Sequence, residues 1–198
     1  LPISDDNENK LVRGKRDPPL VCDEENNMKA KLTRTLPLLA LTLCAGANAG
    51  TFMDAPWAAE MCKAWNSSAL PTGLGGDAWA ANNAGRGYKI IHLYRDKCGA
   101  GSKVELEISD KGGKAECTYG GAVKHSELNY DVDYLMYATD EDWTCMGEGK
   151  FGCGAMGAMM TGKLKFKGPK GEAMGVMGPF DGFLVLTGKV AGDKSSCP

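Results

Sequence analysis

The chain has 198 residues, a formal net charge of −2 at pH 7 and a hydrophobic content of 43%. Its balanced charge excludes the usual kind of nucleic-acid-binding protein, which needs a concentrated basic surface. Its length is enough for one domain with a sizeable core, and the composition is that of a globular protein.

Residues 28–49 have the three parts of a secretory signal peptide. The basic stretch Met28–Arg34 precedes the apolar run Thr35–Cys44, and Ala47-Asn48-Ala49 is a typical cleavage sequence. The apolar run is shorter than the roughly 20 residues that a membrane-spanning helix needs, and a buried core helix is the weaker alternative. We therefore expect a periplasmic or secreted protein.

Residues 1–27 are predicted to be a disordered leader, because they contain few apolar residues and no periodicity. A signal peptide acts at the N-terminus of a chain, so we expect Met28 to be the true start and residues 1–27 to be a gene-model artefact. The mature domain then comprises residues 50–198.

Six cysteines lie in the mature domain. An even number in an exported chain favours disulfides, since the compartment is oxidising. Six cysteines allow fifteen complete pairings, and their spacing does not choose among them. One short-loop disulfide would suit the two cysteines that flank the glycine-rich segment 146–152. The candidates are Cys62, Cys98, Cys117, Cys145, Cys153 and Cys197.

The first predicted element of the domain is a helix from Phe52 to Ser67. Asp54 can cap it and Pro56 suits an early helical position. Apolar residues recur through it at helical spacing and form one face. A glycine- and proline-rich break follows at 71–76, and residues 77–83 can form a short second helix.

The next segments have the character of β strands. Residues 88–94 are rich in β-forming side chains. Residues 104–108 alternate, turn at 109–113 and return over 114–119, which predicts a hairpin. A further strand fits Tyr130–Tyr137.

The C-terminal third mixes short helices with one strand. Thr139 can cap a helix over 139–143, and the glycine- and methionine-rich segment 151–160 has helical spacing. Residues 163–167 alternate as a strand, with Leu164 and Phe166 on its inward face.

A helix is predicted after Gly168-Pro169, and Gly178-Pro179 should stop or kink it. Residues 183–190 are apolar enough for a strand or a helix, and the pattern does not separate the two. The order of elements predicts an α+β fold in which helices cover a largely antiparallel sheet.

Three runs in this part of the chain carry a resemblance: Tyr137-Ala-Thr-Asp-Glu-Asp-Trp143, Met159-Met-Thr-Gly-Lys-Leu-Lys-Phe-Lys-Gly168 and Glu172-Ala-Met174. Together they resemble the sterol carrier protein 2 (SCP2) domain. In that family a strand leads into a D-x-D/E-D helix start, a short helix ends in M-x-G-K-L-K-x-x-G, and a lipid-facing helix follows. The earlier helix and hairpin agree with the family in order only.

The resemblance implies an SCP2-like fold, with about five strands in a largely antiparallel sheet and covering helices that enclose an apolar tunnel. The family's ligands are sterols, fatty acids or acyl-CoA. Most members are intracellular and poor in cysteine, and the insert between Cys145 and Cys153 lengthens the link between two helices. An exported protein is not expected to meet acyl-CoA, so a sterol or another membrane-derived lipid is the expected partner.

Six of the ten methionines lie between Met146 and Met177. Methionine is flexible and suits apolar cavities that accept several ligands, although ordinary core packing is the alternative for any one of them. We predict a lipid-binding cavity lined by Leu135, Phe151, Met156, Met159, Met160, Leu164, Phe166, Met174, Met177 and Phe180.

Three lysines, Lys163, Lys165 and Lys167, share the outward face of the strand at 163–167. They can contact anionic lipid headgroups during a transient encounter with a membrane, each contributing about 1 kcal/mol. A solvated strand face that protects a sheet edge is the alternative.

A second hypothesis is Cu(I) binding in the periplasm through the methionine cluster Met156–Met177, since thioethers are ligands for this ion. The methionines, however, lie in apolar segments and the chain has only two histidines. A third hypothesis is an interaction module without a ligand.

No catalytic residues or cofactors are predicted. His125, Ser126 and Glu127 are adjacent in sequence, which does not make a triad. Asp131 and Asp133 alternate on one predicted strand face, where a solvated position is expected. The expected function is therefore non-enzymatic binding and transfer of a sterol, a fatty acid or another apolar lipid.

Overall fold

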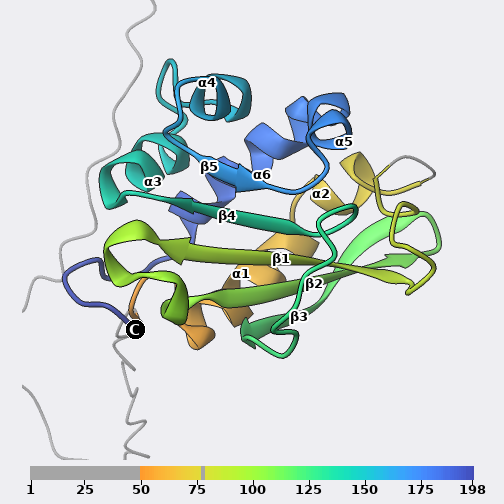
Figure 1. Cartoon of the computed structure of the whole chain (residues 1–198), viewed down its shortest axis with the longest axis horizontal. Coiled ribbons are helices and arrows are strands. Elements are labelled where there is room, and N and C mark those ends of the chain that lie inside the picture. Colours follow the sequence, from red (N-terminus) through yellow and green to blue (C-terminus); the bar gives the residue numbers. More distant parts are fainter. Residues whose placement is uncertain (1–49, 77–78) are drawn as a thin grey trace, which may run out of the picture. The chain divides into compact units, whose positions relative to one another are not determined.

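The computed structural model describes residues 50–76 and 79–198 (Figure 1). The predicted leader and signal peptide lie outside the described residues. The strands are β1 (Tyr88–Arg95), β2 (Val104–Lys111), β3 (Lys114–Ala122), β4 (Tyr134–Ala138) and β5 (Lys165–Lys167). The helices are α1 (Ala55–Asn66), α2 (Leu70–Gly73), α3 (Asp140–Gly147), α4 (Ala155–Met160), α5 (Lys170–Gly175) and α6 (Met177–Lys189), with 3₁₀ turns at Asp96–Cys98 and Ala100–Ser102.

The described residues form one five-stranded sheet in the order β3-β2-β1-β4-β5. β1 and β4 are parallel and the other neighbouring strands are antiparallel. Helices α1 and α6 lie behind the sheet in Figure 1, and α4 and α5 lie at its β5 edge. The predicted α+β class and the largely antiparallel five-stranded sheet are confirmed.

The start of helix α1 and its packing on the sheet follow from residues in and near the helix. The Asp54 carboxylate accepts hydrogen bonds from the backbone N–H groups of Thr51 and Trp57, so the helix begins at Ala55. Its apolar face packs on β3, where a Cβ on Gly120 would come within 2.1 Å of the Ala58 carbonyl oxygen. A side chain at position 120 would therefore separate the helix from the sheet.

Three segments differ from the sequence prediction, and the structure decides a fourth that the pattern left open. Residues 70–73 form the short helix α2 inside the expected break, and residues 79–83 form turns. β4 begins at Tyr134, because the Val132 and Asp133 N–H groups close a turn onto the Asn129 carbonyl. The undecided segment 183–190 lies mostly in α6. The helix predicted after Gly168-Pro169 is α5, which ends at Gly175, before Pro179. Pro179 lies instead in the first turn of α6, where no N–H donor is needed.

The six cysteines of the domain form three disulfides in the described part of the chain. They are Cys62–Cys117, Cys98–Cys197 and Cys145–Cys153, with Cα–Cα distances of 5.3, 5.5 and 5.8 Å. The first joins α1 to β3, the second joins the end of β1 to the C-terminal tail, and the third closes the loop after α3. The disulfide prediction is confirmed, including the short loop.

A buried ion pair holds the C-terminal tail and the start of α3 to β1. The Arg95 guanidinium is fully buried and donates from Nε to Asp140 Oδ1 at 2.6 Å and from Nη2 to Oδ2 at 2.7 Å. It also donates to the carbonyl oxygens of Lys194 and Ser196. The end of β1, the start of α3 and the tail therefore share one charged centre.

Asp140→Asn is expected to lower the free energy of unfolding by about 2 kcal/mol at pH 7. The hydrogen bonds from Arg95, and then Lys97, lower the pKa of Asp140 from 3.8 to about 2. A carboxylate whose folded pKa is lowered stabilises the protein above its unfolded pKa, and this contribution is lost as the pH falls towards 2. Denaturant unfolding between pH 2 and 7 should therefore show a flatter acid dependence in the variant, and an unchanged dependence would contradict this account.

Candidate functional site

Six of the ten predicted lipid-contacting side chains line one groove at the β5 edge of the sheet. The groove has a volume of about 300 Å³ and lies between α4, β5 and α5. Its lining comprises Met156, Met159, Met160, Leu164, Phe166, Lys170 and Met174. Apart from Lys170 the lining is apolar, so the groove suits an aliphatic or ring-shaped apolar ligand.

The small residues of α4 explain why its methionines face outward. Ala155 and Ala158 are fully buried against the core, whereas Met156 and Met160 are exposed. The start of the helix is joined to α6, because the Ala155 N–H donates to the Asp181 carboxylate. The helix thus presents a methionine surface to the groove and to solvent.

The other four predicted residues lie elsewhere. Phe180 is buried in the interior, and Met177 is partly buried against the core. Leu135 lies between Tyr134 and Met136 on β4, so it faces the opposite side of the sheet from these two core residues. The Phe151 side chain is exposed on the disulfide-closed loop.

A small cavity lies between the sheet and the helices. Its volume is about 20 Å³, enough for about one water molecule and far below the 300–1,000 Å³ of typical ligand pockets. Its lining comprises Trp65, Leu74, Trp79, Ile91, Tyr134, Met136, Ala173, Val176, Phe180 and Phe183. This cavity and the groove share no lining residue, so these two hollows of the described residues do not show the expected continuous tunnel.

The Phe166 side chain lies between the surface groove and the internal cavity. Its ring lines the groove and makes edge-to-face contacts with Tyr134 at 5.3 Å and with Phe180 at 6.2 Å between ring centroids. Both of those partners line the cavity. A movement of Phe166, together with the neighbouring α5, would join the groove to the interior.

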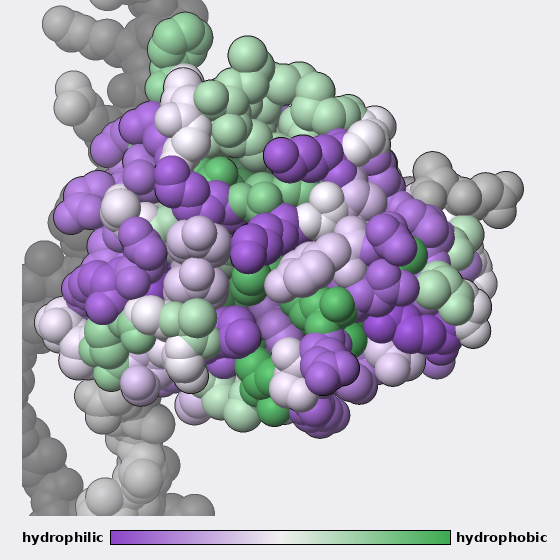
Figure 2. Space-filling view, in the orientation of Figure 1, coloured by the Kyte–Doolittle hydropathy of each residue, from purple (hydrophilic) through white to green (hydrophobic). Residues whose placement is uncertain are grey.

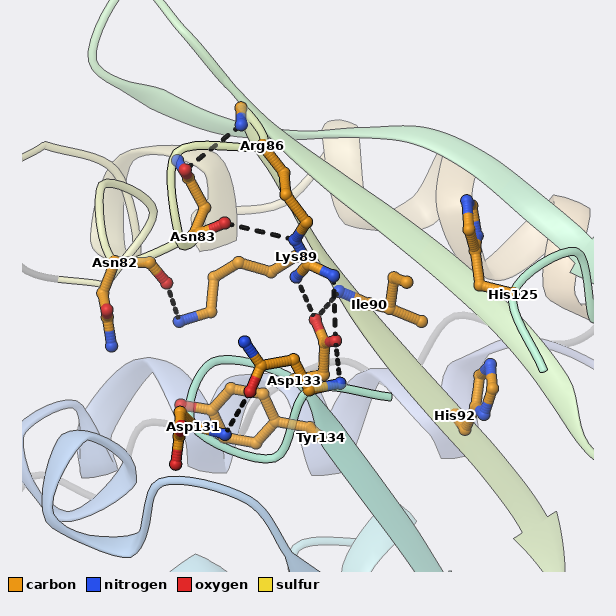
Figure 3. A network of polar contacts seen from close by, with 12 residues as sticks. Asn82, Asn83, Arg86, Lys89, Ile90, His92, His125, Asp131, Asp133 and Tyr134 are labelled. Atoms are coloured by element: carbon orange, nitrogen blue, oxygen red, sulfur yellow. Dashed lines mark hydrogen bonds and ion pairs between the residues drawn. The ribbon is translucent and has the colours of Figure 1, made fainter. Parts of the chain in front are cut away.

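A buried charged network holds α5 to the sheet. Lys89 is fully buried, and its Nζ donates to Glu172 Oε1 at 2.6 Å and to the Trp79 carbonyl at 3.1 Å. It also donates to the Asn82 carbonyl at 2.9 Å (Figure 3). The Tyr134 hydroxyl also donates to Glu172. Burial lowers the pKa of Lys89 while Glu172 opposes the shift, and burial raises the pKa of Tyr134. Glu172 is thus the main polar tie between α5 and the core.

A second pair, Arg86 and Asp133, fixes the chain at the entry to β4 (Figure 3). The fully buried Asp133 accepts from Arg86 Nη2 at 2.6 Å and from the Ile90 backbone N–H at 2.9 Å. The hydrogen bond to Asp133 raises the pKa of Arg86. The expectation of a solvated strand face is therefore wrong for Asp133, whereas Asp131 is exposed.

Both histidines of the chain contact the buried Glu105 on the face of the sheet opposite the helices. His92 Nε2 lies 3.1 Å from Glu105 Oε2, and His125 Nδ1 lies 2.8 Å from Oε1. Burial lowers the pKa of His92. Burial alone would raise the pKa of Glu105, but the hydrogen bonds from His125, His92 and Lys124 outweigh it and lower that pKa. These contacts hold the connection between β3 and β4, which contains Lys124 and His125, against the sheet.

Glu105 and His125, with Glu107, are also the residues best placed to hold a metal ion in the described part of the chain, since their ligand atoms lie within 4.8 Å of one another. However, both Glu105 oxygens already accept hydrogen bonds, including those from the Lys124 and His125 backbone N–H groups at 3.0 and 2.9 Å. These hydrogen bonds therefore hold the connection after β3 to the sheet, and they occupy both carboxylate oxygens of Glu105. The groove likewise does not favour Cu(I), because its four methionines are joined by no histidine or cysteine among the lining residues.

The buried pair of Lys89 and Glu172 was not predicted from the sequence. A usable signal was present, because Lys89 alternates with Ile91 and Leu93 and must share their helix-facing side of β1. A lysine on a buried face needs a partner, and this one comes from 83 residues further along the chain.

The fold and the groove define an α+β domain with an apolar surface groove next to a closed core. No family model and no curated protein matches the chain. It is similar to a crystal structure of sterol carrier protein 2, at 20% identity over 70% of this chain and 98% of that chain, with a TM-score of 0.43.

Two further solved structures are similar. One is a solution structure of a conserved hypothetical protein from Thermus thermophilus, described as possibly a sterol carrier protein, at 22% identity over 76% of this chain and 99% of that chain, with a TM-score of 0.43. The other is apo sterol carrier protein 2 from Yarrowia lipolytica, at 21% identity over 67% and 77% of the two chains, with a TM-score of 0.31. None of the helices in the described residues has the length and apolar composition to cross a membrane.

Proposed function

We propose that this protein is a non-enzymatic carrier that binds one sterol, fatty acid or similar apolar lipid in the groove between α4, β5 and α5. The observation that carries the proposal is the convergence of six apolar side chains on a groove of about 300 Å³. The motif between Tyr137 and Met174, which resembles that of the SCP2 domain, supports it from the sequence.

Burial of the ligand supplies the binding energy. An alkyl chain that loses about 300 Å² of apolar surface to the groove gains about 7 kcal/mol before the costs of association. The methionines can adapt their side chains to ligands of different shape, because each has several rotatable bonds and a polarizable sulfur. The groove therefore suits a class of lipids rather than one molecule.

A bulkier ligand extends inward when α5 moves away from the sheet, which requires the contacts of Glu172 with Lys89 and Tyr134 to break. This helix has six residues, no side-chain cap at its N-terminus and only Ala173 buried. Ala173 also lines the internal cavity, and Phe166 separates that cavity from the groove. Moving α5 and Phe166 together would let a sterol-sized body pass between the sheet and the helices.

We place the carrier in an oxidising compartment, the periplasm or the outside of the cell. The three disulfides of the domain support this placement, as does the signal-peptide pattern at residues 28–49. The ligand would then come from a membrane, which the protein contacts transiently.

Titration with cis-parinaric acid and with dehydroergosterol tests the proposal. Both probes accept energy from tryptophan, and Trp65 and Trp79 line the cavity next to the groove. We expect saturable binding of at least one probe with a Kd in the micromolar range or below, together with quenching of tryptophan emission. No saturable binding of either probe would contradict the proposal, and Cu(I) uptake without lipid binding would support the metal-binding alternative.

A further inference from the structure

The rim of the groove exposes an unusual set of apolar side chains. Of the five large apolar side chains exposed in the described residues, four lie in this region. The exposed fractions are 107% for Phe151, 80% for Met160, 47% for Met174 and 40% for Met156, and the fifth residue, Tyr130, lies in the connection between β3 and β4. Figure 2 shows a predominantly hydrophobic cap over α4, with hydrophilic side chains along its border. A patch of this kind marks an interaction surface.

The loop that carries Phe151 is constrained in a way that leaves this side chain exposed to solvent. The Cys145–Cys153 disulfide closes it, and the Lys150 N–H donates to the Cys145 carbonyl at 3.1 Å. The glycines on either side of Lys150-Phe151 have φ angles of 63° and 79°, which favour glycine and make the turn tight. Phe151 is therefore held at the tip of a constrained loop and does not fold back onto the core.

Several lysines lie on the segments next to this apolar rim. Lys165, Lys167 and Lys170 are exposed and make no ion pair within the described residues. Lys163 pairs with Asp142 at 3.3 Å and Lys150 pairs with Glu148. The border of the patch thus carries uncompensated positive charge, which complements an anionic surface.

We propose that Phe151, Met156, Met160 and Met174, together with Lys165, Lys167 and Lys170, form a docking surface for an anionic phospholipid bilayer. Phenylalanine and methionine enter the boundary between headgroups and acyl chains, and the lysines contact lipid phosphates. All three methionines of this surface also line the groove, so a lipid can pass from the bilayer into the groove without crossing water. The inference deepens the proposed function by assigning the membrane surface with which the carrier exchanges its ligand.

A bilayer fits this surface better than a protein partner does. The apolar groups project from a loop tip and from the two short helices α4 and α5, and a protein would have to supply a matching pocket for each of them. Fluid acyl chains adapt to such projections without a preformed shape. Among the described residues, three unpaired lysines at the border outnumber the one unpaired carboxylate beside α4, Asp181, and this excess of positive charge matches an anionic surface.

Partition into lipid vesicles tests the docking surface. The purified, oxidised protein is sedimented with vesicles of phosphatidylcholine, with and without phosphatidylglycerol. We expect binding to the anionic vesicles that weakens with salt, and a Phe151→Ser variant should lower the partition coefficient about tenfold. Tyr130→Ser, which removes another exposed aromatic ring away from the surface, is the matched control and should bind as the unmodified protein does.

A second variant tests the electrostatic part. Lys165→Glu with Lys167→Glu should reduce binding to the anionic vesicles and remove most of its salt dependence, because unpaired positive charge at the border is lost. Both variants change exposed side chains, so folding should be preserved. Equal partitioning of Phe151→Ser and the unmodified protein, or no binding to anionic vesicles at all, would overturn the proposal.

Binding of cis-parinaric acid without vesicles separates this proposal from the proposed function. Phe151 does not line the groove, so Phe151→Ser should bind the probe with unchanged affinity. Probe binding without vesicle binding would overturn the docking surface alone. Vesicle binding without probe binding would support the surface and overturn the carrier function.

Discussion

A Met174→Asp variant is expected to bind a fluorescent fatty acid at least about 30-fold more weakly than the unmodified protein. Met174 lines the groove and is 47% exposed, so water can solvate an aspartate there in the free protein. A bound acyl chain would bury that carboxylate without a partner, which costs about 2 kcal/mol or more. Direct fluorescence titration measures the affinity, and an unchanged thermal transition shows that folding is retained.

The control for this prediction is Tyr130→Asp, which introduces the same charge at an exposed apolar position outside the groove. Its affinity for the fatty acid should equal that of the unmodified protein. Met156→Asp provides a second test from the opposite wall of the groove and should also abolish most binding. Unchanged affinity in both Met174→Asp and Met156→Asp would remove the groove as the binding site.

Glu172→Gln is expected to destabilise the protein by about 3 kcal/mol at pH 7. The substitution leaves the fully buried Lys89 ammonium with neutral acceptors only, which are the introduced amide oxygen and the carbonyl oxygens of Trp79 and Asn82. An uncompensated buried charge is costly, whereas removal of both charges is not. The double variant Lys89→Met/Glu172→Gln should therefore recover most of the lost stability in denaturant unfolding with the disulfides intact.

The pH dependence of the Glu172→Gln variant gives an independent test. Burial lowers the pKa of Lys89, and Glu172 is the main group that opposes the shift, so its loss lowers that pKa further. The unfolded chain then binds more protons than the folded one at alkaline pH, and the stability deficit should shrink as the pH rises. A loss below about 1 kcal/mol at pH 7, with no recovery in the double variant, would contradict a structural role for this pair.

Local signals were enough to predict much of the fold. Asp54 and Thr139 cap their helices as expected, because a cap depends only on the next few residues. The hairpin of β2 and β3 follows from alternation around a glycine turn. The parallel pairing of β1 with β4 has no such local mark, since it depends on a connection that crosses the sheet.

The helical state of residues 183–190 also depends on tertiary contacts. The segment is apolar without a clear period, so its pattern fits either state. In the structure, α6 passes so close to α3 that a Cβ on Gly147 would lie 2.7 Å from the Gly188 Cα. Two glycines 41 positions apart allow this close approach of the helices. Nothing in the sequence around either glycine indicates that the two pack against each other.

The candidate site was predicted in part. The methionines were expected near one another, and four of them do share the groove, since short helices bring residues 156–160 and 174 to the same edge. Composition could not show that Ala155 and Ala158 take the buried side of α4 and leave Met156 and Met160 exposed. It also could not show that Phe151 would project from a closed loop.

The most direct test of the central claim uses protein labelled with ¹³C at the methionine methyl groups and titrated with a nitroxide-labelled fatty acid. Paramagnetic broadening depends steeply on distance, and Met53 and Met61 line neither the groove nor the internal cavity. We predict saturable broadening of Met156, Met159, Met160 and Met174, with little effect on the fully buried Met53 and Met61. Saturable broadening elsewhere, or no saturable broadening at all, would contradict lipid binding in the groove.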